Sequence, residues 1–148
     1  RTIQAIAQGR EPLSCVYVAE DAGEVVGMAY ACPSKDETQP KEVGELDMLY
    51  IKRSHHRRGI GTALMKAAAT HMAGLGISRL QLCTPTDHTQ GRRFYDKLGG
   101  KIVGSRVDYD NGDVIPLVVY EWADIGELVR LDTGKIWGNL GITWMISL

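Results

Sequence analysis

The chain has 148 residues, of which 44% are hydrophobic and 24% are charged, and its formal net charge is −1. This composition is typical of one globular domain with a hydrophobic core. The nearly neutral charge argues against a nucleic-acid partner, and no apolar run is long enough for a membrane span. Three cysteines, Cys15, Cys32 and Cys83, lie in apolar strand-like runs, a pattern that favours free thiols in a reducing cytoplasm.

The first elements along the chain are a short helix and a hairpin. Residues 2–9 predict a helix, and because the chain begins at Arg1 inside this pattern, we expect further residues to precede it. The β-branched and aromatic run 14–20 predicts a strand. A turn at 21–23 connects it to the returning strand, residues 24–32.

The middle of the chain predicts a strand, a basic loop and a long helix. After the polar loop 33–41, residues 43–51 predict a third strand. Strand alternation gives it two faces, with Glu45, Asp47, Leu49 and Ile51 on one and Leu46, Met48 and Tyr50 on the other. The loop 52–58 is basic. Apolar side chains then recur at helical spacing from 59 to 73, namely Ile60, Leu64, Ala67, Ala68, His71, Met72 and Leu75 just beyond.

The second half of the chain predicts a strand over 79–84, a turn over 85–88, a helix over 90–98 and strands over 101–108 and 114–122. Asn111-Gly112 joins the last two strands and favours a tight hairpin turn. Pro116 indicates a bulge or a sheet edge. We therefore predict a mixed α/β fold with helices on the faces of its sheet.

The tail after Glu127 departs from this plan. It is apolar enough to need burial, with Trp137, Ile142, Trp144, Met145 and Ile146. Three interpretations stay open: the tail adds a strand, wraps its own sheet, or packs on a second subunit. We treat residues 1–123 as the domain and 124–148 as a C-terminal extension of unknown role.

The most informative motif stands between the third strand and the long helix: His56-Arg57-Arg58-Gly59-Ile60-Gly61-Thr62. Glycine lets a ligand approach the backbone, and the first turn of a helix presents unpaired N–H groups with partial positive charge. The arginines add charge-assisted hydrogen bonds. The motif predicts a site for a phosphate-bearing ligand, although its spacing fits neither a P-loop nor a dinucleotide fingerprint. A basic turn before an ordinary helix is the alternative.

The element order and two motifs resemble the GNAT superfamily of acyl-CoA-dependent N-acyltransferases. The family pattern Gln/Arg-x-x-Gly-x-Gly/Ala falls on residues 56–61, with His56 in place of Gln or Arg. A second element is the helix end Phe94-Tyr95-Asp96-Lys97-Leu98-Gly99. The resemblance covers residues 2–123 and implies a mixed, mostly antiparallel twisted sheet, flanked by helices, whose central strands splay apart. It also implies that the family's first strand and first helix precede Arg1.

The resemblance implies acetyl-CoA as the acyl-donor cosubstrate and no metal. Its pyrophosphate would lie on the backbone of Arg57, Arg58, Gly59, Ile60, Gly61 and Thr62. Its pantetheine would bond the unpaired backbone of Leu49, Tyr50 and Ile51, which would also polarise the thioester carbonyl. His88 occupies the position of a family asparagine that bonds the pantetheine. A solvent-exposed turn histidine is the alternative.

Acyl transfer to an amine needs a base for the amine and an acid for the departing thiolate. Tyr95 matches the family tyrosine and stays protonated at neutral pH, so it is the candidate acid, with a plain core aromatic as the alternative. Glu45 lies fourteen residues before Gly59, where several family members carry a base. Asp47 shares its face and is a candidate to share the role of base or to bind the substrate ammonium, and His88 is another candidate base. A solvated acidic face and a base acting through water are the alternatives.

The sequence therefore predicts a cytoplasmic N-acetyltransferase that acts on a small-molecule or peptide amine by direct attack in a ternary complex. A catalytically silent acyl-CoA-binding sensor on the same fold is the alternative. Acidic residues at 45, 47, 108, 110 and 113 favour a cationic acceptor. A homodimer through the C-terminal strands or the tail is a further expectation.

Overall fold

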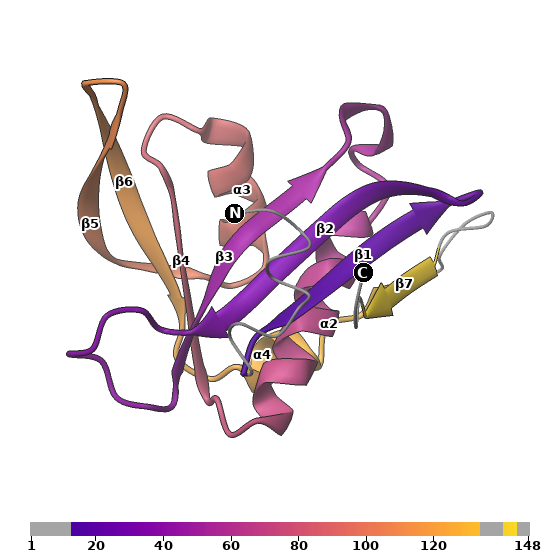
Figure 1. Ribbon diagram of the computed structural model, residues 1–148, viewed down its shortest axis with the longest axis horizontal. Coiled ribbons are helices and arrows are strands. Elements are labelled where there is room, and N and C mark those ends of the chain that lie inside the picture. The colour runs from indigo at the N-terminus through magenta and orange to yellow at the C-terminus, as the bar shows by residue number, and fades with distance from the viewer. Residues whose placement is uncertain (1–12, 134–140, 145–148) are drawn as a thin grey trace.

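The computed structural model describes residues 13–133 and the backbone of residues 141–144. A seven-stranded sheet runs through it in the order β5-β6-β4-β3-β2-β1-β7. The strands are β1 (Cys15–Asp21), β2 (Glu24–Pro33), β3 (Val43–Ile51), β4 (Arg79–Pro85), β5 (Lys101–Asp110), β6 (Asp113–Trp122) and β7 (Gly141–Trp144). The helices are η1 (Arg53–His55), α2 (Ile60–Gly74), α3 (Thr89–Lys97) and α4 (Gly126–Val129). Figure 1 shows α2 across one face of the sheet and α3 near β3 and β4.

The predicted mixed, mostly antiparallel sheet with flanking helices is confirmed. The six predicted strands are all present, whereas the helix predicted over 2–9 lies outside the described residues. Only β3 and β4 run parallel among the described strand pairs, and their ladder has three steps, from Val43↔Arg79 to Glu45↔Gln81. Beyond that point β3 and β4 no longer pair with each other, although each still pairs with its other neighbour. The sheet therefore splays between them as expected.

The main core lies between α2 and the sheet. The helix buries Ile60, Ala63, Leu64, Met65, Ala68, Ala69 and Met72. The buried face differs from the predicted one: Ala63, Met65 and Ala69 are buried, whereas Ala67 and His71 are only partly buried. Leu75 was expected on the buried face and is instead 43% exposed, since α2 ends at Gly74. The sheet and α2 thus form one rigid base for the residues at the splay.

Part of the tail joins this base. Leu128 in α4 is fully buried in the main core. Residues 141–144 form β7, which pairs antiparallel with β1 from Tyr17↔Trp144 to Glu20↔Gly141. Of the three interpretations of the tail, the structure therefore supports an added strand.

The alternation predicted for β3 is wrong in its middle. Tyr30 pairs with Met48 and Ala31 with Leu46, so Asp47 is the extra residue of a β-bulge. Because a bulge shifts the following side chains to the opposite face, Leu46 lies on the α2 face together with Leu49 and Ile51. Glu45 pairs with Cys32, which belongs to the cluster on the other face, where Met48 also packs. Glu45 is thereby on the face opposite Leu46, Leu49 and Ile51.

The β5–β6 hairpin turns where predicted, with φ of +50° at Asn111 and +86° at Gly112. The irregularity of this hairpin lies between Ile102 and Gly104, not at Pro116. Pro116 lies one residue beyond the β4 ladder, which ends at Pro85↔Leu117. Pro116 is therefore neither at a bulge nor on an edge strand, and its missing N–H costs no bond because the β4 ladder has ended.

Candidate active site

The predicted phosphate motif forms a tight turn that leads into α2. Arg57 and Gly59 have φ of +63° and +77°, and Gly59 is the N-cap. Glycine adopts this left-handed conformation without the steric cost of a Cβ. The amide of Ala63 donates to the Gly59 carbonyl 3.1 Å away, so the amides of residues 59–62 precede the first helical hydrogen bond. Free amides at a helix start suit an anion, and the phosphate site predicted here, called below the anion-binding turn (residues 56–62), stays a prediction.

His56, which departs from the family pattern, ties this turn to β3. Its Nε2 lies 2.9 Å from the carbonyl oxygen of Ile51, the last residue of the strand. A ring N–H that donates here fixes the loop against the strand end. The Ile51 carbonyl thus has a protein partner, which leaves the Ile51 N–H and the Leu49 backbone groups for a ligand, since alternate residues such as Tyr50 bond β2.

The splay exposes one side of β3. Leu49 and Ile51 pack towards the core while Tyr50 is 56% exposed. All three lie beyond the last β3–β4 pair, Glu45↔Gln81, and they pair with β2 on their other side. Their backbone groups that face β4 have no strand partner among the described residues. His56, the first residue of the turn at 56–62, contacts the end of this edge at the Ile51 carbonyl.

Tyr95 lies on α3 at the apolar side of the splay. Its ring contacts Phe94, Tyr120 and Trp122, with centroid distances of 5.4, 5.5 and 6.4 Å. Burial raises the pKa of the phenol, and the neighbouring Tyr120 raises it further. The phenol therefore keeps its proton across the neutral range. Within the described residues no hydrogen bond engages its hydroxyl, which leaves that group for a ligand.

The anion-binding turn and α3 touch directly. A Cβ built on Gly61 would lie 3.0 Å from the Phe94 ring carbon Cζ, closer than side chains normally pack. Two bonds from β6 hold α3 in this place: Tyr120 Oη donates to Asp96 Oδ1 at 2.9 Å, and Trp122 Nε1 donates to the Leu98 carbonyl at 3.0 Å. The second glycine of the motif therefore serves helix packing, in addition to leaving room for a ligand.

Glu45 and Asp47 are brought together by Lys35 in the β2–β3 loop. The Lys35 amide donates to Glu45 Oε1 at 3.0 Å, and its Nζ lies 3.1 Å from Asp47 Oδ1. Burial raises the pKa of Cys83 on β4, Arg106 lowers it, and Glu45, Asp108 and Asp47 raise it. The two acids therefore lie near β4 on the face opposite α2, together with charges from β5.

One known protein family matches most of this chain. Residues 2–100 match the family model of the Acetyltransferase (GNAT) family. The chain belongs to this family. It is 33% identical over 91 residues to N-acetyltransferase 8 of Homo sapiens, across 62% of the chain and 40% of that protein. It is 24% identical over 99 residues to mycothiol acetyltransferase of Propionibacterium freudenreichii, across 67% and 31%. The chain thus spans less than half the length of these GNAT relatives.

Solved GNAT structures have the same fold. An N-acetyltransferase from Staphylococcus aureus Mu50 superposes with a TM-score of 0.71 and 18% identity, over 83% of this chain and 74% of that one. The structure of yncA from Salmonella typhimurium, with its cofactor acetyl-CoA, gives a TM-score of 0.70 and 18% identity over 81% and 71%. The family and fold expected from the two motifs are confirmed.

His88 occupies the asparagine position of the GNAT pattern and is the N-cap residue of α3. Its Nδ1 lies 3.4 Å from Thr84 Oγ1, a long contact. A Cβ on Gly91 would lie 2.5 Å from the same ring nitrogen, so the ring folds over the first turn of α3. The side chain is exposed at the end of β4, and its role toward pantetheine stays a prediction.

The described part of this GNAT chain has neither a metal-ligand cluster nor a membrane-spanning helix. No group of three or more His, Cys, Asp and Glu side chains there is arranged to hold a metal ion. No helix there has both the length and the apolar composition required to cross a bilayer.

Proposed function

We propose that this GNAT domain is an N-acetyltransferase that moves the acetyl group of acetyl-CoA to a primary amine. The observation that carries the proposal is one continuous arrangement. The free amides of residues 59–62 adjoin the unpaired edge of Leu49–Ile51, and Tyr95 lies on the helix beside them. The free amides suit a pyrophosphate, and the strand edge suits the amide groups of a pantetheine arm. Tyr95 can supply the proton that the departing thiolate needs.

In the proposed reaction the amine nitrogen attacks the thioester carbonyl carbon. The backbone edge of β3 donates to the carbonyl oxygen as negative charge develops on it. The C–S bond breaks, and the thiolate of CoA takes the proton of the Tyr95 hydroxyl. Glu45 takes one proton from the acceptor ammonium before the attack, directly or through water, and the second proton, lost from the tetrahedral adduct, restores the Tyr95 hydroxyl. The reaction therefore needs neither a covalent enzyme intermediate nor a nucleophile supplied by the enzyme.

We propose a cationic amine as acceptor, bound at Asp47. The Lys35 ammonium already lies 3.1 Å from this carboxylate, which is the contact that a substrate ammonium would make. Asp108 acts on the same region and adds negative charge. The buried thiol of Cys15 supports a reducing, cytoplasmic setting.

A thermal-shift titration with acetyl-CoA tests the donor. A ligand at one hundred times its Kd stabilises the native state by about 2.7 kcal/mol, so we expect Tm to rise by about 6–10 °C. CoA release, followed with a thiol reagent over a panel of amines, then tests catalysis. A Tm shift without release for any amine would favour the silent sensor, and no Tm shift would contradict both functions.

We further propose that the chain forms a homodimer through β5. This strand is at one edge of the sheet, and all ten of its residues are exposed. An antiparallel pairing with a second copy, centred on Val107, places Arg106 opposite Asp108 of the partner subunit, twice by symmetry. Opposite charges across strands contribute about 0.2–1 kcal/mol each, and the apolar side chain of Val107, 55% exposed alone, is covered.

A charge exchange tests this dimer. We expect the wild-type chain to elute as a dimer in size-exclusion chromatography with light scattering. Arg106→Glu places like charges opposite each other and should give a monomer. Adding Asp108→Arg restores both cross-strand pairs and should restore the dimer. A wild-type monomer, or a dimer unaffected by Arg106→Glu, would contradict the proposed pairing.

A further inference from the structure

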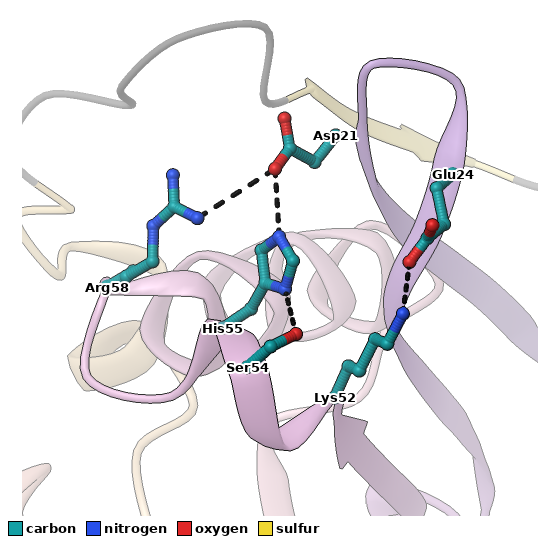
Figure 2. Close-up of polar contacts among 6 residues, drawn as sticks. All are labelled: Asp21, Glu24, Lys52, Ser54, His55 and Arg58. Carbon is teal, nitrogen blue, oxygen red and sulfur yellow. Dashed lines mark hydrogen bonds and ion pairs between the residues drawn. The ribbon is translucent and has the colours of Figure 1, made fainter.

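The basic loop before α2 is held by the two acids that flank one tight turn. Asp21 and Glu24 close the β1–β2 hairpin, and the residues between them, Ala22 and Gly23, have φ of +50° and +84°. Figure 2 shows the contacts. Asp21 Oδ2 lies 2.8 Å from His55 Nε2 and 3.8 Å from Arg58 Nη1. Glu24 pairs with Lys52 at the other end of the loop.

The Asp21 contacts are placed to fix the anion-binding turn. One carboxylate oxygen of Asp21 contacts both His55 and Arg58, which stand on either side of Arg57, the residue with positive φ. His55 is itself held by Ser54, whose Oγ lies 2.8 Å from His55 Nδ1. The His55 side chain is only 13% exposed, so this end of the loop is the better buried one. The carboxylate thereby sets the distance between η1 and the start of α2.

We infer that Asp21 is a positioning residue for the acetyl-CoA pyrophosphate site, an inference that rests on the proposed function. Asp21 holds Arg58 and the turn at 57–59 in the binding geometry before the ligand arrives, so that binding loses less conformational entropy. By Coulomb's law alone, a carboxylate beside a phosphate site would weaken anion binding. Positioning and repulsion therefore predict opposite signs for the effect of removing the charge.

The test compares two neutralising variants of the same turn. Asp21→Asn keeps the shape and removes the charge that holds Arg58. We expect it to raise KM for acetyl-CoA by about three-fold, the size of one partly exposed ion pair, with kcat unchanged. Glu24→Gln removes the same charge from the same turn but releases only Lys52, outside the anion-binding turn. We expect it to leave both constants within error.

Each contrary outcome is informative. A fall in KM for Asp21→Asn would show that repulsion outweighs positioning, and equal rises for both variants would show a general effect of turn stability. Either result overturns the inference. In an Arg58→Gln background, Asp21→Asn should have little further effect, because contacts in one network are not additive. An undiminished effect there also overturns it. A wild-type chain that binds no acetyl-CoA would instead reject the proposed function.

Discussion

Replacing Tyr95 with Phe should lower kcat for amine acetylation by about 100-fold and leave KM for acetyl-CoA nearly unchanged. General acid catalysis typically contributes about 10²–10⁴-fold, and water can replace part of it in an open site. The hydroxyl is the only group removed. The ring keeps its contacts with Phe94, Tyr120 and Trp122, so the fold should be preserved. Steady-state kinetics by CoA release, with Tm measured for each variant, check the result.

Tyr120→Phe is the matched control. Tyr120 is fully buried, its ring centroid lies 5.5 Å from that of Tyr95, and its hydroxyl bonds Asp96 on α3 rather than facing the splay. We expect this variant to lose about 1 kcal/mol of stability and to keep kcat within a few-fold. If Tyr95→Phe kept full kcat, Tyr95 would be a core aromatic residue and the acid would have to be sought elsewhere. Equal losses in both variants would point to displacement of α3.

The features that the sequence predicts well are local ones. The turn at Asn111-Gly112 is set by two residues that tolerate positive φ, and the motif at 56–62 combines a helix start with the glycine that the N-cap needs. Each depends on neighbours in the chain, so a single sequence contains the information. The same holds for the strand patterns, which predict β1 to β6.

Features that depend on pairing between distant segments were predicted wrongly or not at all. The bulge at Asp47 is visible only in the register with β2, and it moved Leu46 to the other face of β3. The contact of Asp21 with Arg58 joins a hairpin turn to a loop. An aspartate in a turn and an arginine in a surface loop are both common, so neither residue indicates the contact. Lys35 was assigned only to a polar loop, although it contacts Asp47. Tertiary packing decides all of these.

Replacing Gly61 with Val should weaken acetyl-CoA binding by about five-fold or more. The first carbon of the new side chain would lie 3.0 Å from Phe94 and 3.4 Å from Ile51, and the branched methyls would come closer still. Overpacking of this kind costs about 1–3 kcal/mol, and 1.4 kcal/mol is a factor of ten in affinity. The chain relieves it by moving α3 away or by tilting the first turn of α2. Both movements disturb the proposed site.

Gly74→Val in the same helix separates this effect from helix propensity. No atom lies within 4 Å of a Cβ at Gly74, so the identical substitution there meets open space. We expect calorimetric Kd values for acetyl-CoA to be unchanged in Gly74→Val and raised in Gly61→Val. Because Phe94 precedes Tyr95, Gly61→Val should also lower kcat, which distinguishes it from loss of a phosphate contact alone. Weakened binding with unaltered kcat would mean that the α2 start moves while α3 stays, so that the two parts of the site are mechanically independent.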